Sequence, residues 1–219
     1  LLISLEGCMV ESDRGKRLEY SDYGLCILVR HALCEDNCIK VLPRRSSPLT
    51  KAGECGAISL GKQLQRMRRS LPLRSIAVSP LLRAYKSAIL LSQVLSLPVK
   101  EDPRLAEVDF GQAEGMTPEE FYNVFPEKAA GATEVGDPSF CWPGGERRGN
   151  LFQRAIDACN FYCSYEQRGT IVVTHWTITG ISIAYINACL HRWPEFGLGH
   201  CEYRVLSGES MRYRYLNQS

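Results

Sequence analysis

Two apolar stretches of the chain end in a histidine, and this pattern is the feature that most constrains the fold. Residues 26–30 form the run Cys-Ile-Leu-Val-Arg before His31, and residues 169–174 form a second apolar run before His175. Short β-branched runs bounded by polar residues are typical of buried strands in a parallel sheet. In open α/β sheets, ligands bind outside the carboxyl ends of the strands. We therefore expect both histidines at one edge of a central sheet, beside a ligand.

Strands and amphipathic helices alternate along the rest of the chain. Further strands are expected at residues 75–78, 97–100 and 201–206, the last as the first arm of a hairpin whose second arm is 211–215. Helices are expected to begin at Thr50, Ser79 and Thr117, which are capping residues, and from about Arg147 and after His175, where apolar residues recur at helical spacing. This alternation indicates an α/β protein, a three-layer sandwich whose central, mostly parallel sheet is flanked by helices.

The segment that follows the strand at residues 75–78 has the features of an anion site. Ser79 is a good N-cap and Pro80 a good first helical residue, which places Arg83 in the first turn of the helix. A helix N-terminus offers free N–H groups and the positive end of the helix dipole, and an arginine adds a bidentate donor. We expect this helix start to face the same edge of the sheet as His31.

Composition and charge further limit the expected domain organisation, partners and cellular location. The length suits one domain over residues 1–219, with 1–24 as an N-terminal decoration and 110–146 as a lid or cap segment. The formal net charge of +2 gives no reason to expect a nucleic-acid or membrane partner. Most of the ten cysteines lie in apolar runs, which favours a reducing, cytoplasmic location. The sequence leaves the oligomeric state open, with a dimer as one option. It also leaves open whether an N-terminal targeting segment was removed.

An ordered set of short motifs resembles the histidine phosphatase superfamily, which has the phosphoglycerate mutase-like fold. The motifs are Arg30-His31-Ala32 with Glu35 and Asn37, Leu49-Thr50 with Gly53, Ser79-Pro80-Leu81-Leu82-Arg83-Ala84, Leu105 with Glu107, Phe110, Gly111, Glu114 and Gly115, Pro143-Gly144-Gly145-Glu146, and Val173-Thr174-His175. The Glu107 motif is similar to that of the phosphatase branch. Two positions depart from the family pattern, because Ala32 and Trp176 stand where the family usually has glycine.

The resemblance implies a role for each site residue. His31 would be the catalytic nucleophile that attacks phosphorus and becomes a transient phosphohistidine. Glu107 would be the catalytic acid, donating a proton to the leaving alkoxide and then taking one from the attacking water. His175 would be catalytic as well, and the phosphoryl oxygens would be held by Arg30, Asn37, Arg83 and His175. The resemblance implies no metal ligands and no cofactor.

The function implied is that of a metal-independent phosphomonoesterase of the histidine acid phosphatase type, whose partner is a small phosphorylated substrate. Two alternatives stay open: a catalytically weak protein of the same fold that binds anions or partners, which Ala32 and Trp176 favour, and a phosphoglycerate-type mutase. His191 and His200 fall in loop or edge positions, and we interpret both as non-catalytic.

Overall fold

The computed structural model describes residues 24–68 and 71–207. Within these residues the sheet has five strands: β1 (Leu25–Arg30), β2 (Ser75–Val78), β3 (Val99–Glu101), β4 (Thr170–Thr174) and β5 (Tyr203–Ser207). Their order across the sheet is β3-β2-β4-β1-β5. All neighbouring strands are parallel except β1 and β5, which are antiparallel. The sheet is therefore mostly parallel, as expected, with an antiparallel strand at one edge.

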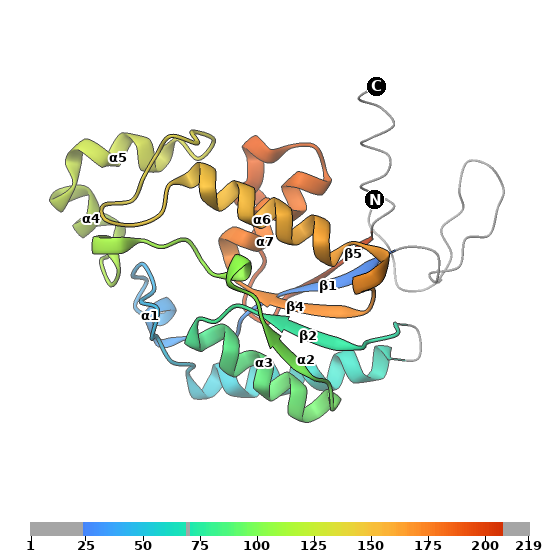
Figure 1. Cartoon of the computed structure of the whole chain (residues 1–219). Coiled ribbons are helices and arrows are strands. Elements are labelled where there is room, and N and C mark those ends of the chain that lie inside the picture. The colour runs from blue at the N-terminus through green and yellow to red at the C-terminus, as the bar shows by residue number, and fades with distance from the viewer. Residues whose placement is uncertain (1–23, 69–70, 208–219) are drawn as a thin grey trace, which may run out of the picture.

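Helices cover both faces of this sheet (Figure 1). The α-helices are α1 (Glu35–Cys38), α2 (Lys51–Met67), α3 (Leu82–Leu95), α4 (Pro118–Val124), α5 (Pro126–Thr133), α6 (Arg148–Tyr162) and α7 (Trp176–Ile186). Short 3-10 turns occur at η2 (Pro103–Leu105), η3 (Gly111–Ala113), η4 (Tyr165–Gln167) and η5 (Leu190–Phe196). Helices α2 and α3 lie on one face and α6 and α7 on the other, which confirms the predicted three-layer α/β fold. No helix in the described ranges combines the length and apolar character that a membrane crossing needs.

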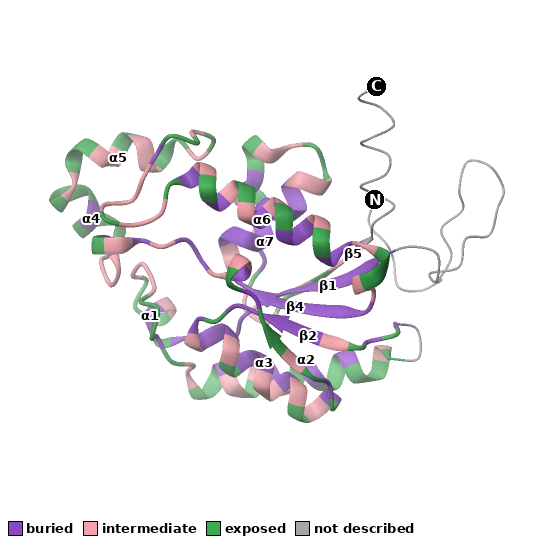
Figure 2. Cartoon of the chain, viewed as in Figure 1, coloured by how far each residue is buried: buried purple, intermediate pink, exposed green. Residues whose placement is uncertain are grey.

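Alternation along β1 divides the core into two halves. Leu25, Ile27 and Val29 pack with the buried faces of α2 and α3, while Cys26 and Leu28 pack with α6 and α7. Successive side chains of a strand point to opposite faces, so a strand buried on both faces must be apolar throughout. Figure 2 shows the result, with β1 and β4 buried in the middle of the sheet and helices on both sides whose outer faces are exposed.

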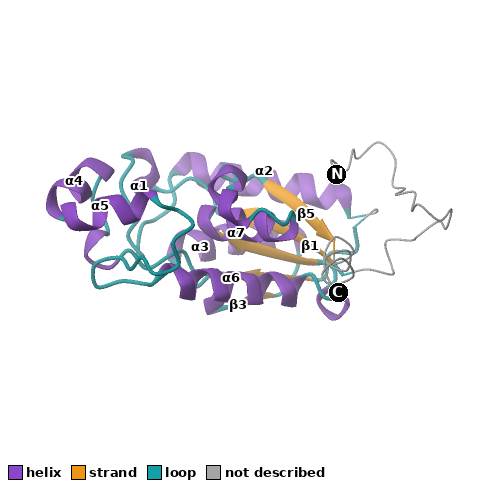
Figure 3. Ribbon diagram, turned by 90° about the horizontal axis from the view of Figure 1, so that it is seen from above, coloured by secondary structure: helices purple, strands orange, loops and turns teal. Residues whose placement is uncertain are grey.

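A third apolar cluster lies between the segment that follows β3 and the two helices α6 and α7. Phe110, Ala113 and Phe121 pack there against Leu151 and Ile178. Helices α4 and α5 lie at one end of the sheet beside α1, as two views at right angles show (Figures 1 and 3). A backbone hydrogen bond joins the 110–146 segment to the loop after His31, since the Leu42 amide donates to the Met116 carbonyl at 2.8 Å. The 110–146 segment thus adjoins the loop after His31, and its role as a lid stays a prediction.

The sequence-based boundaries of two helices are wrong. Helix α3 begins at Leu82 rather than at Pro80, with Leu81 as its N-cap residue, although the Ser79 hydroxyl accepts from the Leu81 amide at 3.2 Å. The apolar spacing after His175 predicts a helix that reaches Ala188 with this residue inward, but α7 ends at Ile186 and Ala188 is exposed beyond it with a φ of 57°. The predicted N-terminal decoration, apart from Gly24, and the second hairpin arm lie outside the described residues.

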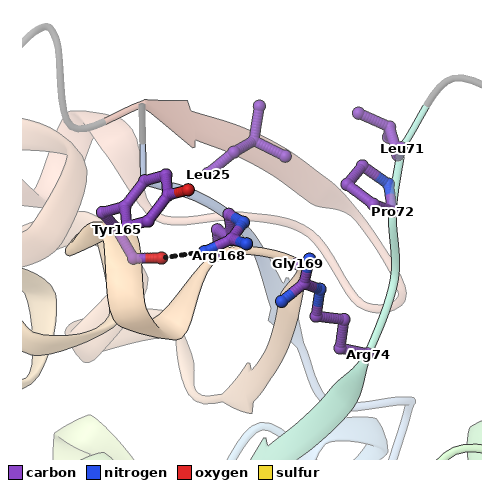
Figure 4. Close-up of a pocket in the computed structure, with 7 residues that line it drawn as sticks. All are labelled: Leu25, Leu71, Pro72, Arg74, Tyr165, Arg168 and Gly169. Carbon is purple, nitrogen blue, oxygen red and sulfur yellow. Dashed lines mark hydrogen bonds between the residues drawn. The ribbon is translucent and has the colours of Figure 1, made fainter. Parts of the chain in front are cut away.

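A cavity of about 250 Å³ opens at the amino ends of the strands, opposite the ends that carry the histidines (Figure 4). It is lined by Leu25, Leu71, Pro72, Arg74, Tyr165, Arg168 and Gly169. The Arg168 guanidinium donates to the Tyr165 carbonyl at 3.2 Å and lies 4.1 Å from the centre of its ring. Neither histidine of the strand ends reaches this cavity, so the candidate chemistry belongs to the other edge of the sheet.

We predict that Ile171→Ala in β4 lowers the free energy of unfolding by about 2–5 kcal/mol, because it leaves a cavity in the core. Ile171 is fully buried at 0% exposure, and its matched control, Ile39→Ala, changes a residue that is 62% exposed. Urea unfolding curves of the two variants measure the difference. Equal effects of the two substitutions would contradict this account of the core.

Candidate active site

The pairing of β1 with β4 places the two predicted histidines side by side. These strands are parallel neighbours with Arg30 opposite Thr174, and the His31 amide donates to the Thr174 carbonyl at 2.8 Å. The imidazole rings of His31 and His175 have centroids 5.0 Å apart. Both side chains are buried, so the strand ends form a shielded site rather than a surface patch.

Hydrogen bonds define the proton position on His31. Its Nδ1 lies 2.7 Å from the Ala32 carbonyl oxygen, which can only accept, so Nδ1 carries the proton and Nε2 keeps a lone pair. Arg83 Nε donates to this Nε2 at 3.3 Å. Burial, followed by the charge of Arg83, lowers the pKa of His31 well below its usual value. His31 is therefore neutral near pH 7 and has a nucleophilic nitrogen that faces an arginine.

The alanine that replaces the family's glycine fits the loop without strain. Ala32 does not have a positive φ, and its side chain is buried. Its amide donates to Ser87 Oγ at 3.0 Å, and the Ser87 hydroxyl in turn donates to the Arg83 carbonyl at 2.7 Å. Because only a positive φ would require glycine here, this substitution leaves the geometry of His31 intact.

Two arginines converge on the histidines from different elements. Arg83, in the first turn of α3, is 1% exposed and donates through Nη1 to the Arg44 carbonyl at 2.9 Å. Arg30 donates through Nη1 to the Leu198 carbonyl at 3.0 Å. Burial lowers the pKa of each guanidinium, while the nearby Glu107 carboxylate acts in the opposite direction on both. Arginine stays charged under such conditions, so the site holds concentrated positive charge.

The second histidine leaves a buried donor without a partner. His175 Nε2 lies 2.7 Å from Ser79 Oγ, which already accepts a bond from the Leu81 amide, so the hydroxyl proton is best directed at Nε2. This arrangement places the ring proton on Nδ1, a buried atom with no hydrogen-bond partner, and Arg30 Nε is buried and unpartnered in the same way. Buried donors are normally satisfied, so two of them beside His31 point to an anion that binds between them.

The predicted acid lies in the same cluster. Glu107 is buried in the loop that follows η2, and its Oε1 accepts from the Val108 amide at 3.0 Å. Its carboxylate is near enough to Arg30 and Arg83 to act on the pKa of both guanidiniums in the raising direction. Among residues 24–68 and 71–207, no three His, Cys, Asp or Glu side chains are grouped as metal ligands.

The structure adds His200, which the sequence analysis had set aside as non-catalytic. Its ring centroid lies 5.6 Å from that of His31, and its Nε2 lies 2.9 Å from Asn37 Oδ1. Cys34 also donates to this Oδ1, which leaves the amide nitrogen of Asn37 for another partner. Burial, together with the charge of Arg30, lowers the pKa of His200 to about 4.

The position of His200 follows from the antiparallel edge strand. The amide of Cys201 donates to the Arg30 carbonyl at 3.3 Å, which brings the start of β5 beside the end of β1. No motif around His200 indicates that this residue lies beside His31. Only the pairing of two strands far apart in the sequence could have revealed this position.

The bulky residue after His175 packs away from the two histidines. Trp176 contacts Trp193 with ring centroids 5.3 Å apart and lies directly against Gly197, where a side chain would collide with it. The neighbouring Leu198 carbonyl accepts the bond from Arg30. Trp176 therefore supports the segment that holds Arg30.

Comparisons with known proteins agree with this arrangement. The sequence matches the family described as Histidine phosphatase superfamily (branch 1) over residues 26–218. It is 28% identical over 190 residues to phosphoserine phosphatase 1 of Hydrogenobacter thermophilus, covering 85% of this chain and 87% of the relative. The structure resembles a putative alpha-ribazole-5'-P phosphatase from Escherichia coli, with a TM-score of 0.72 at 20% identity over 84% of this chain and 89% of that one.

A second solved structure, a mycobacterial glucosyl-3-phosphoglycerate phosphatase in complex with VO3, matches with a TM-score of 0.66 at 23% identity. The match covers 83% of this chain and 90% of that one. These likenesses confirm the expected phosphoglycerate mutase-like fold.

We predict that the free energy of unfolding falls as the pH drops from about 6.5, the usual histidine pKa, towards about 4. The buried histidines have a lowered pKa in the folded protein, so the unfolded chain binds more protons in this range and acid favours unfolding. His200→Asn, which removes one titrating group, should make the fall shallower. Urea unfolding at about pH 7 and about pH 5 measures this effect, and an unchanged difference in the variant would contradict it.

Proposed function

Because the chain belongs to the histidine phosphatase superfamily, we propose that it is a metal-independent phosphomonoesterase of the histidine acid phosphatase type. It would hydrolyse a small phosphorylated metabolite through a phosphohistidine at His31. The observation that most supports this is the pair of unpartnered buried donors, Arg30 Nε and His175 Nδ1, beside the neutral Nε2 of His31. They suit a phosphoryl group that comes within reach of a nucleophile.

The reaction divides into two transfers. In the first, His31 Nε2 forms a bond to phosphorus, the ester P–O bond breaks, and protonated Glu107 gives its proton to the leaving alkoxide. In the second, the Glu107 carboxylate takes a proton from water as its oxygen attacks phosphorus. The P–N bond then breaks, phosphate leaves, and His31 and Glu107 return to their starting states.

The protein itself supplies the positive charge for both steps. Arg83 is buried and Arg30 half-buried, and both are charged and fixed by backbone carbonyls, so they need little reorganisation when negative charge shifts between oxygens. His175 Nδ1 would donate to a third phosphoryl oxygen, and the amide nitrogen of Asn37 is available as a further donor to the phosphoryl group. This donor set makes a metal ion unnecessary for phosphoryl transfer in the proposed mechanism.

The relatives suggest which substrates to try first. Their names give phosphoserine, alpha-ribazole 5'-phosphate and glucosyl-3-phosphoglycerate, all monoesters of small metabolites. A panel of these esters, with phosphate release as the readout, is the direct way to find the substrate.

The alternative functions have less support. Ala32 and Trp176, which favoured a weakly catalytic binding protein, are accommodated without displacing His31 or Arg30. A mutase would isomerise 3-phosphoglycerate in the presence of a bisphosphoglycerate primer without net release of phosphate, whereas the proposed phosphatase releases it.

We predict that His31→Ala abolishes hydrolysis of p-nitrophenyl phosphate, with a loss of about 10³-fold or more, because no other described group is placed to form the covalent intermediate. The matched control is His191→Ala, which removes an exposed histidine of η5 and should leave the rate unchanged. If wild type and His31→Ala released phosphate equally, the proposed nucleophile would be wrong.

We also predict that a chelator leaves the activity unchanged, since Arg30 and Arg83 carry the charge that a metal would otherwise supply. The measurement is the rate of phosphate release before and after dialysis against EDTA. A loss that added Mg²⁺ or Zn²⁺ restores would show that the mechanism needs a metal.

A further inference from the structure

The loop that carries Glu107 is fastened to α6 by one arginine. Arg154 Nη1 donates to the carbonyls of Arg104 at 2.9 Å and Ala106 at 2.6 Å, and its Nη2 donates to the Glu107 carbonyl at 3.2 Å. These carbonyls belong to a segment with no strand partner. Arg154 thus supplies hydrogen bonds that a sheet would otherwise provide, while Thr174 Oγ1 donates to the intervening Leu105 carbonyl at 2.6 Å.

The guanidinium is itself held by a carboxylate. Arg154 and Glu146 form a bidentate pair in which both N···O distances are 2.7 Å. The two side chains are only 19% and 16% exposed, so solvent screens the pair weakly. Glu146 also bonds to the far side of the loop, since its amide donates to the Asp109 carbonyl at 2.9 Å. The pair therefore holds the backbone before and after Glu107.

A separate set of contacts fixes the start of the same loop. Asp102 accepts from the Arg104 guanidinium and, at 2.7 Å, from the Tyr162 hydroxyl. Neither Arg154 nor Glu146 takes part in these bonds, so η2 has a support besides the Arg154 bond to the Arg104 carbonyl. What Arg154 adds is the position of Ala106 and Glu107, the part of the loop nearest the two active-site arginines.

We propose that Arg154, locked by Glu146, is a positioning residue that sets the place of the Glu107 carboxyl for proton transfer. This inference rests on the proposed role of Glu107 as the acid. If the clamp is loosened, the nucleophile and the phosphate-binding arginines stay in place, since the hydrogen bonds of Arg154 go to Glu146 and to the carbonyls of the Glu107 loop. The two proton transfers of Glu107 should suffer, and kcat/KM reports the donation to the leaving group, because the attack of water comes after the alcohol has left.

The test is Arg154→Lys, which keeps a positive charge near His175 but cannot form the bidentate pair and three carbonyl bonds together. Two substrates report on proton donation. p-Nitrophenolate leaves without a proton, whereas the alkoxide of glycerol 2-phosphate needs one. We expect kcat/KM to fall by about 10-fold or more for glycerol 2-phosphate and by less than about 3-fold for p-nitrophenyl phosphate.

Arg148→Lys is the matched control on the same helix. Arg148 is also buried and also donates to carbonyls, but those of Gly131, Ala132, Glu134 and Asp137, far from the Glu107 loop. Arg148→Lys should lower kcat/KM for glycerol 2-phosphate and for p-nitrophenyl phosphate equally, if at all. Glu146→Gln, which weakens the clamp without touching Arg154, should reproduce the selective loss of Arg154→Lys at a smaller size, and it serves as the second variant if Arg154→Lys does not fold.

Glu107→Gln distinguishes a failure of the positioning role of Arg154 from a failure of the acid role of Glu107. Selective loss on glycerol 2-phosphate in Glu107→Gln, with an equal loss on both substrates in Arg154→Lys and Glu146→Gln, overturns the positioning role and leaves the proposed acid intact. An equal loss on both substrates in Glu107→Gln overturns the acid role and the positioning role together. Selective loss in Glu107→Gln, Arg154→Lys and Glu146→Gln, but not in Arg148→Lys, supports both.

Discussion

The site depends on the parallel pairing of β1 with β4. The bond from the His31 amide to the Thr174 carbonyl continues this pairing one residue past the strand and fixes the two imidazoles side by side. On the other side of β4, the Ser79 amide bonds to the Val173 carbonyl and places its hydroxyl on His175. Three adjacent strand ends thus deliver three polar side chains to one place.

Burial then determines the chemistry of these side chains. The Ala32 carbonyl holds the proton of His31 on Nδ1, and Arg83 opposes a second proton, so Nε2 stays available as a nucleophile. The arginines are fixed by backbone carbonyls rather than by carboxylates, so their charge is not cancelled by a close ion pair. Such an arrangement holds a neutral nucleophile beside strong positive charge, which is what attack on a phosphate ester needs.

Much of this could be predicted from the sequence, because strands buried on both faces are continuous apolar runs and their ends are visible. The places of His31, His175, Arg83 and Glu107 follow from such runs and from ordered motifs. The hydrogen bond between Ser79 and His175 was not predicted, because nothing local shows that a hydroxyl at the end of β2 meets the histidine at the end of β4. His200 was missed because its place depends on the distant pairing of β5 with β1. The contacts of Arg154 could not be found either, since backbone carbonyls carry no sequence signature.

The central claim is that His31 Nε2 becomes bonded to phosphorus during turnover. The most direct measurement is to quench the working protein in alkali, where phosphohistidine survives, and to locate the phosphoryl group by phosphorus NMR and peptide mass spectrometry. The structure predicts one phosphoryl group, on Nε2 of His31, that disappears as the substrate is used up. A phosphoryl group on another residue or on Nδ1, or steady hydrolysis with none on the protein, would contradict it.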